Sequence, residues 1–566
     1  MKLRHYKGLF SVAAASLLLT ACGGLGKMAK YANDITYNVD PEPLIVRGDS
    51  VELNISGKFP GKYFHKKAMM EMTPTLTYAA GQTEYKMVMY QGENAPGNGI
   101  VVPYDNGKNY TYSDKVAYTP DMEVSEVMIN FKGIMGNKSR DFDPVKIADG
   151  VRTTPFLMLS DDKVLLGKDK FQRITQHDLY AQINYLVNSS HVRGSELRED
   201  DVKAMMALIK DIADDPLKAA TALNIDAYAS PEGEISFNEN LADDRAKSAS
   251  RVVEQEMKRR KLEAAESFFN LRGKGEDWKG FQKAMEASNI PDKDLILRIL
   301  NMYDDVTKRE KEIRNLAATY KVIADKILPD LRRSQMTLVY EITGKTDEEL
   351  LNLARTAPAE LNVEEMLFAA TLIDDINEQL QFYQACEQHH TNDYRGANNV
   401  GYIYMLQNKM NEAEAQFIKS NEIQQNPFAT NNLGVIARLK GDRKKAMEHF
   451  QNATAAGPEV SYNMGLINIQ NGDYQSAIGN MGSENSFNAA LAKMLNGNAQ
   501  GAKTTLEAAP EKDTAMGQYL MAIIGARLAD GNLVKSSLQA AYAQDGSLRD
   551  KASKDLEFRD YRDATK

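Results

Sequence analysis

Few side chains in this 566-residue chain have the type and spacing that chemistry requires. Cys22 and Cys386 are its two thiols, and His389 and His390 lie beside acidic residues with no third metal ligand close by. Residues 344–346 (Gly-Lys-Thr) end like a phosphate-binding loop, but the glycine that should begin that loop is missing. The sequence motifs of zinc proteases and serine hydrolases are absent too. We therefore expect no enzyme activity, no cofactor and no metal.

Cys22 ends a short apolar run, and its surroundings predict a covalent modification. Three basic residues precede an apolar stretch over 9–19, which is too short to span a bilayer, and Leu19-Thr20-Ala21-Cys22 follows. This tetrapeptide resembles the lipobox of bacterial lipoproteins. The resemblance implies removal of a signal peptide (1–21), a diacylglycerol thioether on Cys22 and an added acyl chain such as palmitate. An ordinary secretory signal is the alternative.

The residues after Cys22 bear on location. We expect residues 22–33 to be a linker and the protein to be anchored by lipid in the outer membrane. Surface-exported lipoproteins of the Bacteroidetes tend to carry acidic residues directly after the cysteine, whereas Gly23-Gly24-Leu25-Gly26-Lys27 has none. This difference favours the periplasmic face of that membrane.

Composition limits the partners and the number of domains. The net charge of −9 is spread along the chain, so we expect neither a nucleic-acid partner nor a polybasic membrane patch. Cys386 lies on a helical apolar pattern and fits a small core residue better than a nucleophile. About 545 residues remain after the signal, enough for three or four domains. The predicted fold class is multidomain α+β.

The pattern of residues 34–168 predicts β-strands. Polar and apolar residues alternate over 50–56 and 85–90, and turn signals such as Asp40-Pro41 and 96–99 (Pro-Gly-Asn-Gly) recur between such runs. This spacing predicts an immunoglobulin-like β-sandwich.

Over residues 169–345 the spacing of apolar residues changes, and helical patterns alternate with strand patterns. Strands are expected over 183–187, 223–228 and 336–342, with helices from Ser195 to about 212 and from about Asn238 onward. A mostly helical block over about 263–333 interrupts this pattern. The alternation of strands and helices predicts an α/β domain with a helical insertion.

The loop and helix after the second of these strands resemble a known family. Residues 228–233 (Tyr-Ala-Ser-Pro-Glu-Gly) and 238–246 (Asn-Glu-Asn-Leu-Ala-Asp-Asp-Arg-Ala) are similar to the OmpA-like peptidoglycan-binding domain. In that family a loop aspartate holds the ammonium of diaminopimelate and an arginine holds a carboxylate. The resemblance assigns the arginine role to Arg245, and it places Asn238, Ser230 and Asp226 at the same site.

Ser230 departs from the family pattern because it stands where the aspartate belongs. The loss of a charged hydrogen bond worth about 1.5–3 kcal/mol would weaken wall binding by about ten- to a hundredfold. Asp226, Glu232 or Glu234 could replace the missing acid, or the motif could serve packing alone. The loop and the inserted helical block are similar to OmpA-like proteins of the Bacteroidetes.

Residues 346–566 contain internal repeats. The spacings Gly401 to Gly434 and Gly434 to Gly465 are close to the 34-residue period of the tetratricopeptide repeat, which predicts a C-terminal α-solenoid. We expect small residues to let paired helices approach and phenylalanines to fill the joints between pairs. The predicted packing residues are Gly401, Tyr404, Ala413, Phe417, Gly434, Ala446, Phe450, Gly465 and Ala477.

Together these modules predict a lipid-anchored envelope scaffold. Its partners would be outer-membrane lipid through Cys22, peptidoglycan through the OmpA-like domain, and an unidentified envelope protein in the concave solenoid. The alternative is an accessory subunit of an outer-membrane assembly or secretion machine that does not bind peptidoglycan.

Overall fold

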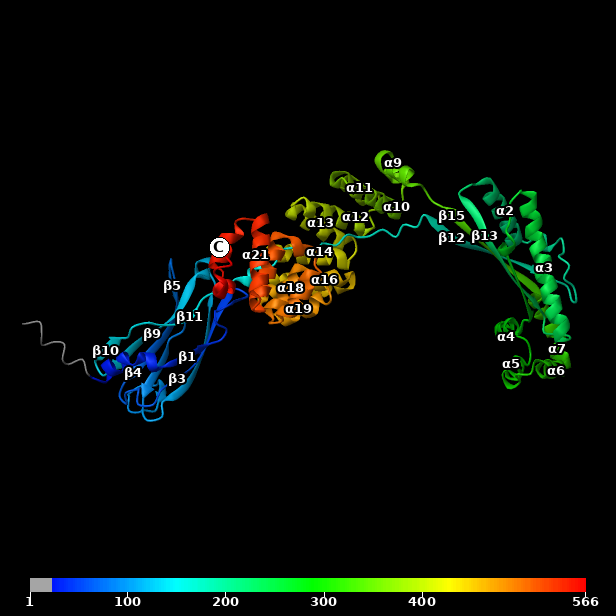
Figure 1. Cartoon of the computed structure of the whole chain (residues 1–566). Coiled ribbons are helices and arrows are strands. Elements are labelled where there is room, and N and C mark those ends of the chain that lie inside the picture. Colours follow the sequence, from blue (N-terminus) through cyan, green and yellow to red (C-terminus); the bar gives the residue numbers. More distant parts are fainter. Residues whose placement is uncertain (1–22) are drawn as a thin grey trace, which may run out of the picture. The chain divides into compact units, whose positions relative to one another are not determined.

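The computed structural model describes residues 23–566, apart from the side chains of residues 266 and 317, and it divides into two compact units. Unit 1 contains the chain up to Gly167 together with His390–Lys566, and unit 2 contains Lys168–His389. Figure 1 follows the chain through both units. The predicted signal peptide and Cys22 lie outside the described residues.

The first part of unit 1 is a pair of β-sheets around one core. In one sheet β3 pairs with β1, β2 and β8; in the other the order is β10-β9-β4-β6-β7, with β11 on β9 and β5 on β4. The strands are β1 (Thr36–Val39), β2 (Val46–Arg47), β3 (Ser50–Phe59), β4 (Met69–Tyr78), β5 (Gly81–Glu84), β6 (Val88–Gly92), β7 (Ile100–Val102), β8 (Lys108–Ala117), β9 (Ser125–Met135), β10 (Lys138–Asp141) and β11 (Val145–Asp149).

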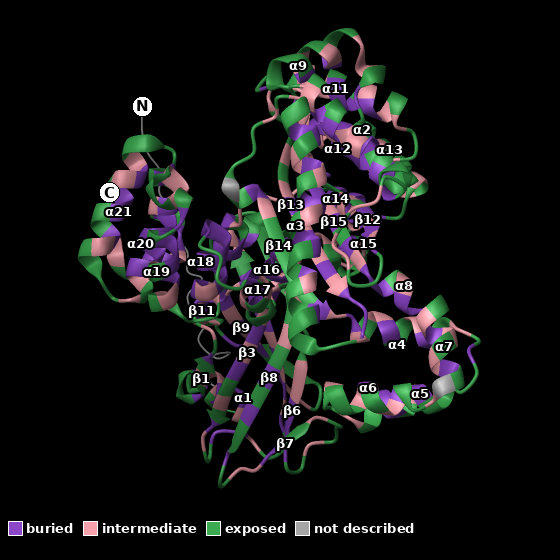
Figure 2. Cartoon of the chain, turned by 90° about the vertical axis from the view of Figure 1, so that its right-hand side faces the viewer, coloured by how far each residue is buried: buried purple, intermediate pink, exposed green. Residues whose placement is uncertain are grey.

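Alternation explains why these residues form a sandwich. Along β3 every second side chain from Val51 to Ile55 is buried, and β4 and β9 contribute facing residues such as Met72 and Ile129 to the same core. Figure 2 shows purple buried residues among half-buried and exposed ones in β3 and β8. The sequence predicted the two-sheet packing, and the immunoglobulin-like connectivity stays a prediction.

Residues 24–33 differ from the expected linker. They form the helix α1 (Gly24–Lys30) and the short 3-10 helix η1 (Ala32–Asp34). Leu25 and Met28 of α1 are buried in the core of the sandwich, because their spacing puts both on one face of the helix. The segment is thus packed onto the sandwich from Gly24 onward.

The second part of unit 1 is a stack of helix pairs. Its helices are α12 (Tyr394–Leu406), α13 (Met410–Ile423), α14 (Pro427–Leu439), α15 (Arg443–Asn452), α16 (Pro458–Asn471), α17 (Tyr474–Met481), α18 (Phe487–Leu495), α19 (Ala499–Glu507), α20 (Ala515–Arg527), α21 (Gly531–Gln544) and α22 (Leu548–Lys554), followed by the 3-10 helix η9 (Leu556–Tyr561). The second helices of four successive pairs, from α15 to α21, are N-capped by Asp442, Asp473, Asn498 and Asp530. The predicted repeats are therefore present as a solenoid.

Unit 2 is built on one four-stranded sheet. The strands β12 (Ile174–Asn184), β13 (Lys218–Ala229), β14 (Phe269–Glu276) and β15 (Arg333–Thr343) take the order β12-β15-β13-β14, and only β13 and β14 are parallel. The helices α2 (Asp200–Asp214) and α3 (Ile235–Arg259) cover one face with a shared apolar core. The first predicted strand lies earlier than expected, and the first helix begins later.

The helical insertion is shorter than predicted. Residues 269–276, expected within it, form the edge strand β14, which continues the sheet beside β13. The inserted helices are α4 (Trp278–Ala287), α5 (Lys293–Met302), α6 (Val306–Arg314), α7 (Ala317–Lys326) and α8 (Leu328–Leu331). They pack around a core of their own.

The boundary of the solenoid also differs. The helices α9 (Asp347–Thr356), α10 (Val363–Thr371) and α11 (Ile376–His389) belong to unit 2, although we expected them to begin the repeats. Contacts with the start of that unit hold them: Phe171 stacks on Phe368 with 4.4 Å between ring centroids, and the Lys170 amide donates to Glu364. Among residues 23–566, no helix is both long and apolar enough to span a membrane.

Candidate functional site

The predicted packing residues lie at the joints of the solenoid. A Cβ added at Gly401 would lie 2.6 Å from the Phe417 ring, and one at Gly434 would lie 2.6 Å from the Phe450 ring. Each phenylalanine therefore fills the space above a glycine within its own helix pair. Phe417 also joins a buried cluster with Ala429 and Ile436 of the next pair. Gly465, Ala413, Ala446 and Ala477 are buried likewise, and Tyr404 is half-buried.

The solenoid carries a row of buried asparagines on the first helix of successive pairs. We call Asn398, Asn399, Asn431, Asn432, Asn463 and Asn488 the asparagine ladder. Each of these side chains has an exposed fraction of 0%. A buried primary amide is unfavourable unless its donor and acceptor are paired. The ladder therefore requires a partner with many hydrogen-bonding groups.

That partner is the chain itself. Residues 158–167, which we call the inner segment, have no helix or strand and join the sandwich to unit 2. In Figure 1 they form an extended cyan trace that passes along the solenoid helices. The sequence placed these residues in the sandwich domain, whereas the structure places them against the repeats, because the ladder binds their backbone.

Four asparagines each hold one residue of the inner segment by both its amide and its carbonyl. Asn488 accepts from the Leu159 amide and donates to its carbonyl, both at 2.9 Å. Asn463 does the same with Lys163 (2.8 and 2.9 Å), Asn432 with Leu165 (2.7 and 2.8 Å) and Asn399 with Gly167 (2.7 and 2.9 Å). A side-chain amide thus replaces the neighbouring strand of a β-sheet. This recognition needs an extended backbone and no particular side chain.

The remaining ladder residues connect these four. Asn431 donates to the Lys163 carbonyl at 2.9 Å, and Asn398 donates to the Leu165 carbonyl at 3.0 Å. The asparagines also bond to one another, as in the 3.1 Å contact from Asn432 to Asn398. Linked hydrogen bonds in a dry environment strengthen each other, so the ladder acts as one network.

Side chains of the inner segment add selectivity. Asp162 forms an ion pair with Arg438 of α14 that is almost fully buried, and the Tyr462 hydroxyl donates to Asp161 at 2.6 Å. The Lys163 ammonium lies 4.5 Å from the centre of the Tyr462 ring. Burial and the neighbouring carboxylate both raise the pKa of Tyr462, so the phenol stays a donor at neutral pH. The groove therefore favours acidic residues over neutral ones at positions 161 and 162.

The ladder residues left a signal in the sequence. Asn399, Asn432 and Asn463 each stand two positions before a repeat glycine, namely Gly401, Gly434 and Gly465. The repeat glycines by themselves predicted only close helix packing. The periodic asparagine, which packing does not require, could have revealed a peptide-binding groove. No comparable pattern marked the inner segment.

Arg245, which the family resemblance singled out in unit 2, lies in the interior. Its side chain is 1% exposed, and its three nitrogens donate to the carbonyls of Ser189, Tyr228 and Leu186 at 2.8–3.2 Å. Burial lowers its pKa to about 10, which leaves it charged at neutral pH. Arg245 thus ties the loop after β12 to the end of β13. A ligand carboxylate would have to displace one of these carbonyls, and that role stays a prediction.

Ser230 and Asn238 also take part in buried networks. The Ser230 hydroxyl donates to Glu232 at 2.6 Å and accepts from Arg332, while Arg332 forms an ion pair with Glu232 at 2.8 Å. Asn238 donates to the Glu232 carbonyl and to the Glu276 carboxylate. An acid therefore lies at Ser230 after all, supplied by Glu232, whose side chain is 22% exposed.

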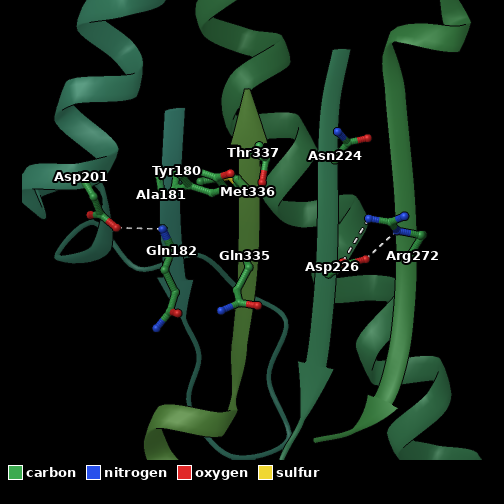
Figure 3. A pocket seen from close by; sticks show the side chains of 10 residues that line it. All are labelled: Tyr180, Ala181, Gln182, Asp201, Asn224, Asp226, Arg272, Gln335, Met336 and Thr337. Atoms are coloured by element: carbon green, nitrogen blue, oxygen red, sulfur yellow. Dashed lines mark hydrogen bonds and ion pairs between the residues drawn. The ribbon is translucent and has the colours of Figure 1, made fainter. Parts of the chain in front are cut away.

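Asp226 lies apart from these residues. It points to the face of the sheet opposite α2 and α3, where it forms a two-pronged ion pair with Arg272. A polar hollow of about 350 Å³ opens on that face, and Gln182, Asn224 and Gln335 line it together with this pair. Figure 3 shows these side chains on the strands. The structure thus does not bring Asp226 to Arg245. Alternate residues of β13 point to opposite faces of the sheet, and Asp226 points away from the face that α3, which carries Arg245, covers.

The remaining candidates for chemistry are Cys386 and possible groups of metal ligands. Cys386 is buried, as its apolar helical pattern predicted. Within residues 23–566, no three His, Cys, Asp or Glu side chains gather closely enough to hold a metal ion.

Comparisons with known proteins add little to this geometry. No family model and no curated protein matches the chain. Among solved structures, it is similar to the crystal structure of the APC/C hetero-tetramer Cut9–Hcn1, with 10% identity and a TM-score of 0.32 over 59% of this chain and 77% of that one. It is also similar to yeast Tom70, with 12% identity and a TM-score of 0.27 over 49% and 64% of the two chains. Similarity at this level carries no functional argument.

Proposed function

We propose that this protein is a scaffold of the bacterial cell envelope whose solenoid binds its own chain. The observation that carries the proposal is the asparagine ladder, which holds the inner segment by paired amide and carbonyl bonds. Because the segment and the groove belong to one chain, the segment binds as an intramolecular ligand, and it is favoured over a free peptide of equal affinity. The groove thereby fixes the solenoid to the sandwich.

The lipid anchor and the cell wall complete this proposal. The resemblance of residues 19–22 to a lipobox supports attachment of Cys22 to the outer membrane, on its periplasmic face. The resemblance of residues 228–246 to OmpA-like domains supports a peptidoglycan contact by unit 2. A partner protein would then bind the outer surface of the solenoid or compete with the inner segment.

The buried state of Arg245 changes which residue is best placed to contact the wall. A diaminopimelate ammonium requires an acid that it can reach, and Glu232, which lies beside Ser230 and pairs with Arg332, is partly exposed at 22%. Arg245 acts as a positioning residue, because its three carbonyl contacts hold the surrounding loops. In this proposal Glu232 takes over the role of the missing aspartate.

A pull-down with purified sacculi tests wall binding. We expect the parent protein to be retained and Glu232→Gln to be retained about tenfold less, because one charge-assisted hydrogen bond is lost. Glu234→Gln removes a neighbouring charge that has no contact with Ser230, and it should behave like the parent. Equal retention of all three proteins would refute the role of Glu232. Absence of retention for the parent would refute wall binding and favour an accessory subunit without it.

A further inference from the structure

The end of the sandwich that carries α1 has an unusual charge. Three stretches gather there, residues 24–33, 61–70 and 136–140, and none contains an acidic residue although the chain as a whole is acidic. The cations of these stretches, which we call the basic end, are Lys27, Lys30, Lys62, Lys66, Lys67, Lys138 and Arg140. All seven are exposed.

Contacts of α1 bring the three stretches together. A Cβ at Gly24 would lie 2.5 Å from the His65 ring, and the Tyr63 hydroxyl donates to the Met28 carbonyl at 3.1 Å. Leu25 packs over Gly133 of β9, the strand that pairs with β10. In Figure 1 the dark-blue helix α1 lies beside β10 at this end of the sandwich. The basic end thus surrounds the first turn of α1.

Few acids neutralise these cations. Lys66 forms an ion pair with Glu93 at 3.7 Å, and within residues 23–566 the other six cations form none. Asp34 and Asp141 border the three stretches. Lys132 is left out of the basic end because Glu71 and Asp141 lie opposite it on neighbouring strands. A clear excess of positive charge remains at this surface.

We infer that the basic end is a docking surface for anionic lipid headgroups. Gly23 follows Cys22 directly and α1 begins at Gly24, so only one residue separates the proposed anchor from α1 in the sequence. Several lysines and arginines near an anionic membrane surface each add to binding. Tyr31, which is 41% exposed beneath the Lys30 ammonium, fits the boundary between headgroups and acyl chains. The surface supplies a second attachment besides the acyl chains.

This inference rests on the proposed anchoring at Cys22 for its orientation, and the test is designed to separate the two. The chain from residue 22 onward, with Cys22→Ser and therefore no acyl chain, is mixed with vesicles of phosphatidylcholine alone or with phosphatidylglycerol added. We expect co-sedimentation with the anionic vesicles only, falling steeply between low and physiological salt because exposed charges are screened. Acyl labelling of Cys22 in cells reports on the anchor independently.

Charge-reversal variants identify the surface. Lys62→Glu, Lys66→Glu and Lys67→Glu together should lower vesicle binding at least tenfold. Lys444→Glu, Lys512→Glu and Lys535→Glu, exposed lysines of the solenoid, change the net charge equally and should bind like the parent. Circular dichroism checks that both triple variants fold. Equal losses in both variants, no binding to anionic vesicles, or equally tight binding to heparin would overturn the inference.

Discussion

Gly434 shows how a single missing side chain sets the distance between two helices. The Phe450 ring occupies the place where a Cβ of residue 434 would be, with 2.6 Å between them. This is closer than carbon atoms pack in protein interiors, so a larger residue requires the ring or the helix to move. The periodic glycines of the repeat are therefore packing residues rather than sites of backbone flexibility.

We predict that Gly434→Ala lowers the free energy of unfolding of unit 1 by about 1–3 kcal/mol through overpacking. Gly479 provides the control, since it lies in α17 with no atom within 4 Å of an added Cβ. Gly479→Ala should be neutral or stabilising by up to about 1 kcal/mol, because alanine favours helices. Urea denaturation measures both values. A similar effect of the two substitutions would contradict the close packing of Gly434.

The inner segment continues from the sandwich and binds the solenoid, so its contacts link the two halves of unit 1. It has no hydrogen bonds of its own within a helix or sheet, and the ladder satisfies its backbone instead. Its conformation therefore depends on the asparagines. The repeated helices could be predicted from their period, whereas this segment could not, because its order comes from contacts with residues more than 200 positions away.

Loss of one ladder residue should open the inner segment to proteases. Asn463→Ala removes both hydrogen bonds to Lys163, each worth about 1 kcal/mol, so trypsin should cleave after Lys163 about 10- to 30-fold faster. Asn496→Ala is the matched control, because Asn496 donates to Gln475 on the solenoid surface and does not touch the segment. Mass spectrometry of a limited digest identifies the cut. Unchanged cleavage in Asn463→Ala would show that the ladder does not restrain the segment.

At the scale of the whole molecule, contacts rather than positions in the chain decide which elements form one compact unit. The sandwich and the solenoid form one compact unit although unit 2 separates them in the sequence. The inner segment is one link, and Glu557 of η9 is another. It accepts from the Thr154 hydroxyl and from Arg527, both at 2.7 Å, with its side chain 1% exposed.

We expect calorimetry to show two unfolding transitions, one for each unit. Glu557→Ala should lower the midpoint of the unit 1 transition alone and cost about 3–5 kcal/mol, because it leaves buried charged and polar partners unpaired. Asp49→Ala breaks the exposed ion pair with Arg443 and should cost about 1 kcal/mol or less. A shift of both transitions by Glu557→Ala, or three independent transitions, would contradict this division of the chain.

The sequence by itself determined the local order of this protein. Alternation predicted the sandwich strands, a change of period predicted the α/β domain, and recurring glycines predicted the solenoid, because each pattern reflects which side chains face a neighbouring core. The tertiary structure decided what joins these elements. It placed Asp226 and Arg245 on different sides of a sheet, buried Arg245 among carbonyls, packed α1 onto the sandwich and filled the solenoid groove with residues 158–167. These contacts join residues distant in the chain, and no local period encodes them.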